Sequence, residues 1–569
     1  MAYQHGIYFS ELATDYTPPL SGTSGVVVAV GTAPSHLAVA AAKPNTAVLA
    51  TKFSEAVEQL GWSEDFDKYT LCEVMNSNFS LFTVGPCIFI NVLDPAKHFN
   101  KVEGAEFEGV TSTPVELEGD FDVNSFVVTS GEYTAPTKLT ANTDYSVVFT
   151  AADDSDTDNI IEASTVLTIL NADAVENNKI AIAYKTAADG EKITTEVTLS
   201  GTTVSLPTDT ILSTVTVETG GVNTQQNLVA GEDYKIEYLA GTLTLTILDD
   251  SKILGDKITV DYHEIDPSKV TAADIIGGVD IATGASTGIE LINSIFAQFR
   301  IVPGTLIAPK YSLDSRVASA LISKAQAVSG MFPAIAVVDL DTTQAKTYAA
   351  AVELKTQKNL NDPHAIVCWP KVRNSDKVYH LSTQLAALMA QTDVRNNDIP
   401  YVSPSNQSLA MDAAVLEDGT EIYLTRDQAN VLNGAGIGTA LSFNNWRFWG
   451  NRTSVYPSSS DPKAAFIPVR RMFNYIHSTF AISYLSRLDQ PITRRALESI
   501  VFSGQIWLDG LVAQGALIGA TLAVAENLTA SDLMDGIVKF TLKITPPSPM
   551  RVISYTLAYD ANNLQTLLG

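Results

Sequence analysis

The chain has 569 residues, which is more than one compact core usually holds, so we expect several domains. Apolar residues make up 46% of the sequence and charged residues 17%, and this composition excludes general disorder. A formal net charge of −27 argues against direct binding of nucleic acid, which requires a positive surface. No membrane insertion is expected, because the longest apolar stretch, Leu511–Ala525, is too short to span a bilayer.

The first residues contain a short apolar stretch, Gly6–Phe9, which Thr17–Pro19 separates from the rest of the chain. No basic start is followed by an apolar run here, so we expect no secretory signal. We therefore predict an N-terminal arm over residues 1–20, with a strand formed by Ile7, Tyr8 and Phe9.

Buried strands alternate with amphipathic helices over residues 21–100 and again over residues 266–440. Val26–Val30 is a continuous apolar run, as expected for a strand that is covered on both faces. Asp314 is the expected cap of the helix that follows it. This alternation predicts one discontinuous α/β core, with further strands at Cys87–Leu93, Pro333–Asp339 and Ala365–Trp369 and helices near Thr342–Gln357 and Val378–Gln391.

The segment between the two parts of this core, residues 101–265, differs sharply in composition. It holds 29 acidic and 8 basic residues, a net charge of −21, and no tryptophan, methionine or cysteine. Short alternating runs of Thr, Val, Ile and Tyr, broken by Gly, Asn and Asp, are typical of all-β modules. We therefore predict an all-β insertion with its own core and a strongly solvated surface.

The insertion also repeats itself. Leu167–Leu170 parallels Leu245–Leu248, and Lys179–Tyr184 parallels Lys257–Tyr262, each pair at an offset of 78 residues. A third pair, Thr143–Phe149 and Glu232–Tyr238, has an offset of 89 residues. The spacing predicts two tandem β-sandwich modules, over residues 101–187 and 188–265.

Residues 441–549 are expected to form a C-terminal α+β domain. A helix is predicted from Gln490-Pro491, and Val538–Ile544 alternates between apolar and polar residues as a half-buried strand does. The stiff link Pro546–Pro549 then leads into residues 550–569. We predict a C-terminal arm there, whose strand presents Ile553, Tyr555, Leu557 and Tyr559 on one face.

No pattern in the chain indicates catalysis, a cofactor or a metal. His364 and Cys368 lie four residues apart without a second ligand pair, so both are expected in the core, as are the other two cysteines. Gly434–Gly438 lacks the spacing of a dinucleotide loop and is expected to be a turn. The acidic run Asp153–Asp158 lacks the glycine and glutamate of a calcium loop. We predict no enzyme activity.

Each end of the chain is thus a strand tethered by a proline-containing link. A lone strand is unstable in water, because its backbone donors and acceptors need partners. Each end can fold back onto its own sheet, or it can complete the sheet of a neighbouring copy. The four-residue link Pro546–Pro549 is too stiff for a tight hairpin with Val538–Ile544, which favours exchange at the C-terminal end.

Trp449–Thr453 has the sequence Trp-Gly-Asn-Arg-Thr, and the arginine pair Arg470-Arg471 follows it. Together with several other segments, this box resembles the tail sheath proteins of contractile phages and of related injection devices, which have a Trp-Gly-x-Arg-Thr box. The resemblance covers the core outside the insertion, and its other segments, in order, are Gly6–Phe9, Val26–Val30, Val302–Pro309, Ala334–Asp339, Gln514–Ala520 and Pro546–Tyr555.

The resemblance implies a subtilisin-like α/β domain without a working protease site. It implies hexameric rings of this chain stacked around a tail tube, with baseplate and tail terminator proteins as further partners. The arms would join neighbouring copies, and the insertion would face outward. Such a sheath is assembled in the bacterial host cytoplasm, becomes part of the virion tail and contracts during genome ejection. Arg494 and Arg495 are our candidates for contact with the tube, and the alternative is that they belong to a solvated helix face.

Three other interpretations remain open at this point. The sheath of a phage-derived bacteriocin or contractile injection system would share the same motifs. A secreted adhesin or surface-layer protein would explain the acidic β modules, but not the α/β core around them. A hydrolase would explain the α/β core, but no nucleophile motif is present.

Overall fold

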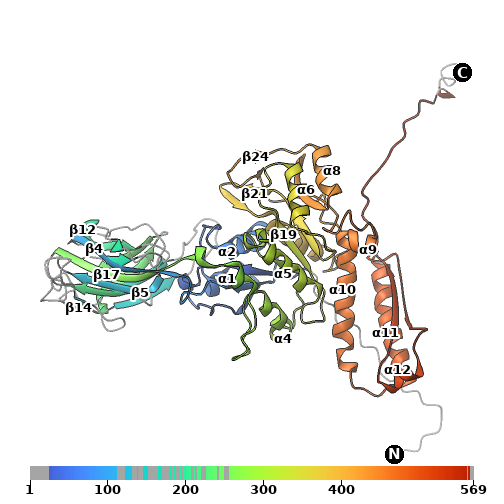
Figure 1. Cartoon of the computed structure of the whole chain (residues 1–569), viewed down its shortest axis with the longest axis horizontal. Coiled ribbons are helices and arrows are strands. Elements are labelled where there is room, and N and C mark those ends of the chain that lie inside the picture. Colours follow the sequence, from blue (N-terminus) through green and yellow to red (C-terminus); the bar gives the residue numbers. More distant parts are fainter. Residues whose placement is uncertain are drawn as a thin grey trace, which may run out of the picture.

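The structure is a computed structural model that describes residues 25–111, separate stretches between 122 and 248, and residues 256–560 and 562–563. The described part is elongated (Figure 1). A β-rich part lies at one end, an α/β body lies in the middle, and two long helices lie at the other end.

The α/β body is built on an eight-stranded sheet with the order β2-β3-β1-β18-β19-β20-β25-β26. The strands from β3 to β25 are parallel to one another, whereas β2 and β26 pair antiparallel at the two edges. The central strands are buried along their whole length, as their continuous apolar runs predict. Their bounds are β1 (Val27–Gly31), β2 (Ala47–Ala50), β3 (Cys87–Asn91), β18 (Thr305–Ile307), β19 (Ile335–Asp339), β20 (Ala365–Cys368), β25 (Ile437–Phe443) and β26 (Asn445–Trp449).

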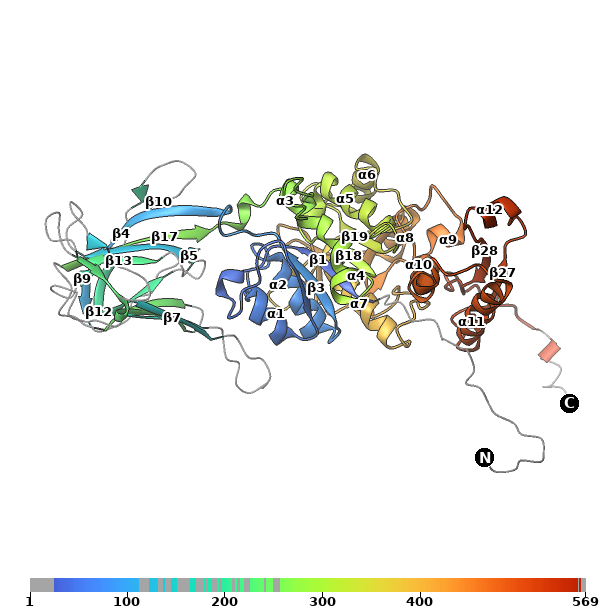
Figure 2. The same ribbon diagram turned by 90° about the horizontal axis from the view of Figure 1, so that it is seen from below.

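Helices cover both faces of this sheet. Helix α5 (Ser315–Gln326) packs against β18 and β19 from one side, and α7 (Leu381–Val394) packs against the same strands from the other (Figure 2). The predicted cap is confirmed, since Asp314 accepts a hydrogen bond from the backbone of Arg316 at 2.8 Å. The mixed α/β architecture expected from the sequence is therefore present. The other helices of the body are α1 (Phe53–Leu60), α2 (Thr70–Met75), α3 (Ala272–Ile276), α4 (Ile295–Phe299), α6 (Tyr348–Gln357) and α8 (Arg426–Gly434).

Residues 371–422 hold a small sheet that the sequence did not indicate. The predicted helix from Val378 is wrong at its start, because 371–374 and 377–379 form the antiparallel pair β21 and β22. Ser375 has a positive φ of 55° in the turn between them, and the helix begins only at Leu381. The sheet has the order β22-β21-β23-β24 and the bounds β21 (Lys371–Asn374), β22 (Lys377–Tyr379), β23 (Ala413–Val415) and β24 (Glu421–Ile422).

The insertion leaves the body after β3 and returns before α3 through two adjacent antiparallel strands, β4 (Phe99–Thr111) and β17 (Asp256–Ile265). The strands of its two predicted modules pair with one another in one sheet, which differs from the predicted pair of separate modules. β7 (Tyr145–Thr150) pairs in parallel with β15 (Ala230–Leu239), and Tyr145 lies opposite Tyr234, its equivalent in the repeat. The repeat thus brings equivalent strands side by side.

The C-terminal part has its own apolar core, between two long helices and a hairpin. Helices α10 (Ile467–Tyr484) and α11 (Arg494–Ala513) pack with β27 (Gly519–Val524) and β28 (Phe540–Thr545). Pro491 does not lie in the first turn of α11 as predicted, because Thr493 caps that helix through a hydrogen bond from the backbone of Ala496. The short helices α9 (Pro462–Ala465) and α12 (Ala530–Met534) complete this part.

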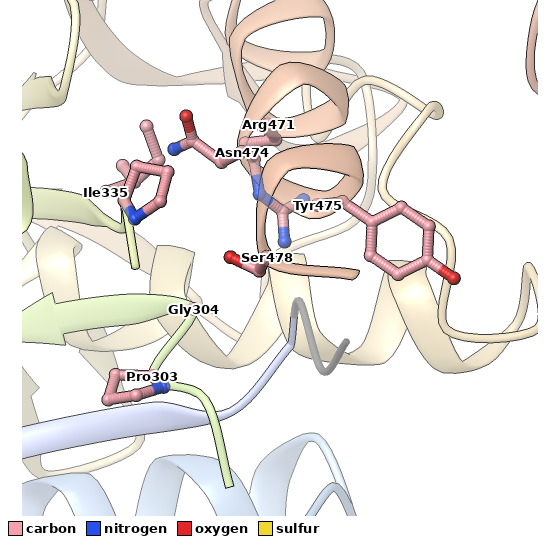
Figure 3. Close-up of a pocket in the computed structure, with 8 residues that line it drawn as sticks. Pro303, Gly304, Ile335, Arg471, Asn474, Tyr475 and Ser478 are labelled. Atoms are coloured by element: carbon pink, nitrogen blue, oxygen red, sulfur yellow. The ribbon is translucent and has the colours of Figure 1, made fainter. Parts of the chain in front are cut away.

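A buried ion pair joins this C-terminal part to the α/β body. Arg471 of α10 donates to the carboxylate of Asp393 at the end of α7, with Nη1 2.9 Å from Oδ1, and both side chains are buried. Asn474 donates to the backbone oxygen of Ala334 at 3.1 Å, just before β19. Figure 3 shows this face of α10 against the starts of β18 and β19, with Pro303 and Ser478 across a small pocket. The two parts therefore meet through paired polar groups.

A cluster of titratable side chains surrounds the neck where the insertion meets the body. Phe99 stacks on His263 with ring centroids 4.2 Å apart, and Lys269 donates to the backbone oxygen of Phe99 at 2.7 Å. Burial raises the pKa of Glu264 from its ordinary value of 4.5 to about 8, although the charge of Lys68 opposes this shift. Glu264 therefore binds a proton in the folded state at pH values where the unfolded chain has lost it.

We expect Glu264→Gln to remove part of the pH dependence of stability. Between pH 4.5 and 8 the folded state binds more protons at Glu264 than the unfolded state, so the wild-type chain loses stability as the pH rises through this window. Between pH 5 and pH 9, the free energy of unfolding of the glutamine variant should fall by on the order of 1 kcal/mol less than that of the wild type. Thermal or urea unfolding measures this difference. The exposed-site variant Glu526→Gln is the control and should follow the wild type. An unchanged slope in Glu264→Gln would contradict the assignment.

Candidate assembly interface

The C-terminal segment carries apolar side chains into solvent. After β28, residues 546–560 form no strand pairing with any other described residue. Tyr555, Leu557 and Tyr559 are 83%, 96% and 81% exposed, and Ile553 is also exposed. Figure 1 shows this segment running past α9 and projecting away from the molecule. Exposed apolar residues spaced two apart on an unpaired extended segment are the features of a strand that pairs with another chain.

The hairpin of β27 and β28 is a sheet of only two strands. Its register runs from Gly519 opposite Thr545 to Val524 opposite Phe540. An isolated two-stranded hairpin is marginally stable in water, and this one is supported on one face by α11. Its inward side chains are only partly buried in the described part of the chain: Phe540, Leu542 and Ile544.

The two edges of this hairpin differ. Gln505 of α11 accepts a hydrogen bond from the backbone N–H of Leu522 at 2.9 Å and donates to the backbone oxygen of Ala520 at 3.2 Å. The Gln505 amide thereby occupies the outer edge of β27 as a strand would. Among the described residues nothing occupies the outer edge of β28 in this way. The open edge of the hairpin is therefore that of β28. There, Leu542 and the residues two positions before and after it direct their backbone N–H and C=O groups away from β27.

The predicted tube-contact residues lie in the first turn of α11. Arg494 and Arg495 are both exposed. The Nε of Arg494 donates to Glu498 at 2.7 Å. Two cations at the amino end of a helix oppose its dipole, so their placement does not serve helix stability. The solvent face continues with Phe502, which is 62% exposed, and Ile506.

Phe502 and Ile506 were missed by the sequence analysis. It predicted a helix from Gln490-Pro491 but gave no role to apolar residues on the exposed face of that helix. The spacing of four residues from Glu498 to Phe502 and Ile506 was the available signal, because such residues share a face of a helix.

The N-terminal arm residues Ile7, Tyr8 and Phe9 lie outside the described residues, as does the acidic run Asp153–Asp158. The turn predicted over Gly434–Gly438 is shorter in the structure: Ala435 and Gly436 form it, whereas Gly434 ends α8 and Gly438 lies in β25. Gly436 has a φ of 70°, and a Cβ there would lie 2.5 Å from the backbone oxygen of Tyr456. The turn therefore requires glycine for close packing.

Two buried carboxylates of the α/β body are engaged by the start of α7. Glu73 accepts a hydrogen bond from the backbone of His380 at 2.6 Å and lies 2.9 Å from its Nδ1, and Ser382 donates both its N–H and its hydroxyl to Asp339. All four side chains are buried, so they tie α2 and β19 to the start of α7. Within the described residues, no group of three or more His, Cys, Asp or Glu side chains is arranged to hold a metal ion.

The cysteines are confirmed as buried free thiols: Cys72, Cys87 and Cys368. Burial raises the pKa of the Cys72 thiol to about 12 and moves the pKa values of the other two in the same direction. Among the helices of the described part of the chain, none has the length and apolar character needed to cross a membrane.

An α/β body, a C-terminal hairpin with one open edge and an unpaired apolar tail are the features of a subunit that associates with other chains. Comparison with known proteins specifies the class. The chain is 27% identical over 477 residues to the tail sheath protein of Burkholderia phage BcepMu, covering 81% of this chain and 92% of that protein. It is 25% identical over 297 residues to the tail sheath protein of Escherichia phage P2, covering 49% of this chain and 69% of that protein. The chain is homologous to phage tail sheath proteins, and the resemblance found in its motifs is confirmed.

No protein-family model matches the chain. The crystal structure of a sheath tail protein from Desulfitobacterium hafniense superposes with a TM-score of 0.45 at 10% sequence identity, covering 91% of this chain and 93% of that one.

Proposed function

We propose that this chain is the structural subunit of a contractile tail sheath and that it catalyses no reaction. Copies polymerise as stacked hexameric rings around a tail tube, and the lattice contracts to drive the tube through the host envelope during genome ejection. The observation that carries this proposal is the open edge of β28 together with the exposed, alternating apolar arm that follows it. Homology to phage tail sheath proteins supports it.

The arm of one copy adds as a strand to the hairpin of another. The outer backbone groups of β28 gain partners, and the apolar face of the arm covers side chains that the hairpin leaves half-buried: Phe540, Leu542 and Ile544. The Gln505 amide on β27 directs this addition to β28. The N-terminal strand of Ile7, Tyr8 and Phe9 is proposed to link copies in the same manner.

The other parts of the chain have roles that follow from this assembly. The α/β core, residues 21–100 and 266–440, is proposed to be subtilisin-like, and its mainly parallel sheet with helices on both faces supports this. The C-terminal domain, residues 441–549, holds the acceptor hairpin. The insertion, residues 101–265, faces outward, because a segment with 29 acidic and 8 basic residues repels its copies least there. The tail tube, baseplate and tail terminator proteins are the other partners, and assembly takes place in the host cytoplasm.

Contraction requires two arrangements of the same lattice. Each body moves as a unit because the buried pair of Arg471 and Asp393 holds the C-terminal part to the α/β body. The arms stay paired with their neighbours while the bodies rotate. A difference of only a few kcal/mol per subunit between the two lattices, summed over many copies, supplies ample work.

Negative-stain electron microscopy of the purified protein tests the proposal. We expect tubes with helical striations at high protein concentration. Monodisperse small particles under all conditions of salt, pH and concentration would contradict it.

Arg494 and Arg495, at the start of α11, are proposed to contact the tube. Reversal of their charge tests this proposal. We expect Arg494→Glu/Arg495→Glu to leave the melting temperature and the self-assembly of the chain unchanged but to reduce assembly on tubes by about tenfold or more. Arg426→Glu is a matched control, because Arg426 also occupies the first position of a helix, α8, in the α/β body. Equal assembly of both variants on tubes would remove Arg494 and Arg495 from the interface.

A further inference from the structure

A buried pair of ionisable groups joins α2 to the first turn of α7. The Oε1 of Glu73 accepts a hydrogen bond from the backbone N–H of His380 at 2.6 Å, and its Oε2 lies 2.9 Å from the Nδ1 of the same residue. The side chains of Glu73 and His380 are only 1% and 4% exposed. The other ring nitrogen of His380, Nε2, has no hydrogen-bond partner among the described residues. Glu73 is therefore the group that holds the imidazole in place.

The other charged groups near this imidazole are engaged by neighbours of their own. Asp339, at the end of β19, accepts hydrogen bonds from the backbone N–H and the hydroxyl of Ser382. Lys371 of β21 forms an ion pair with Glu417 at 2.6 Å. In the part of the chain that the structure describes, the imidazole is thus the basic group that contacts Glu73.

The charge of His380 decides whether this arrangement is favourable. A carboxylate buried away from water is strongly destabilising unless a cation or a proton compensates for its charge. Burial of His380 opposes its protonation, but the charge and the hydrogen bond of Glu73 outweigh burial and raise the pKa of His380 above its ordinary value of 6.5. Asp339 acts in the same direction as Glu73, and Lys371 acts against them. His380 therefore keeps a proton in the folded chain at pH values where an exposed histidine has lost it.

We propose that Glu73 and His380 form a pH-sensitive latch, which holds α2 against the start of α7 while the imidazole is charged and loosens once it is neutral. Loss of the proton leaves the carboxylate of Glu73 buried without a cation, and a local opening of α2 lets water reach that carboxylate. The latch contributes fully below pH 6.5 and weakens as the pH rises through the raised pKa of His380. The opening is local, because Asp339 and Ser382 still tie β19 to α7.

Hydrogen exchange of the α2 amides in the full-length chain tests the latch, with mass spectrometry as the readout and a correction for the intrinsic pH dependence of exchange. We expect the protection of α2 in the wild type to fall about threefold or more between pH 6 and pH 9. Glu73→Gln keeps the shape of the side chain and removes its charge, so its α2 protection should be equal at both pH values. His380→Gln leaves Glu73 without a cation and should show, already at pH 6, the low protection that the wild type shows at pH 9.

Glu264→Gln is the matched control, because Glu264 is a carboxylate at the neck of the insertion that titrates in the same range, with a pKa of about 8. This variant should keep the pH dependence of α2 protection, and its loss there would overturn the latch. Equal α2 protection at pH 6 and pH 9 in the wild type, or a fall in Glu73→Gln as large as that in the wild type, would also overturn it. Should Glu73→Gln fail to fold, the wild-type profile and His380→Gln decide the question. The latch belongs to the α/β body, so each of these outcomes leaves the sheath function standing.

Discussion

Deletion of residues 550–569 is expected to leave a folded, soluble subunit that no longer polymerises. The described residues of this segment make no strand contacts within their own chain, so the melting temperature should stay at the wild-type value. Assembly would lose the backbone hydrogen bonds of a whole strand and the burial of four large apolar side chains. At about 0.5–1.5 kcal/mol for each hydrogen bond, we expect the critical concentration to rise at least about 100-fold.

Two point-substituted chains refine this experiment without shortening the arm. Replacement of the apolar alternate residues, Ile553, Tyr555, Leu557 and Tyr559, by serine should prevent assembly as deletion does. The matched control replaces the intervening residues Ser554, Thr556 and Ala558 by other small polar residues and should assemble normally. Normal sheaths formed by the truncated chain in electron micrographs would show that the C-terminal arm is dispensable.

Loss of one partner of the buried ion pair is expected to have the largest effect on stability. Arg471→Met leaves the carboxylate of Asp393 buried without its cation, which typically costs about 3–5 kcal/mol. The effect should be seen in urea unfolding of the monomer as an earlier transition. The double variant Arg471→Met/Asp393→Leu should recover most of the loss, because no charge then remains buried.

A second, exposed arginine serves as the reference for this experiment. Arg494→Met removes an exposed surface pair with Glu498 and should leave the midpoint of urea unfolding close to that of the wild type, because water screens such a pair. Equal stability of Arg471→Met and the wild type would show that the C-terminal part is not held to the α/β body by this pair.

Much of the α/β body could be predicted from local patterns. Continuous apolar runs such as Val26–Val30 become buried strands because both faces of the sheet are covered by helices. The small sheet of β21 to β24 was missed, since its strands have two to four residues and too few positions to show a period. The repeat in the insertion was visible in the sequence, but its strand pairing was not, because pairing between distant strands leaves no local signal.

The candidate interface shows the same limit. Alternation from Ile553 to Tyr559 and the proline link before it predicted the arm from the sequence alone. The sequence does not show which edge of the hairpin stays open for another strand. That depends on Gln505, whose amide reaches the edge of β27 only when α11 packs on the hairpin.

A cryo-electron microscopy reconstruction of the assembled tubes would show whether the C-terminal arm completes the hairpin of another copy. We expect density for residues 552–559 along the outer edge of β28 in a neighbouring subunit, with backbone hydrogen bonds to Leu542 and its alternate neighbours. Density that places this segment on a sheet of its own subunit, or leaves the edge of β28 unoccupied in the tube, would contradict the claim.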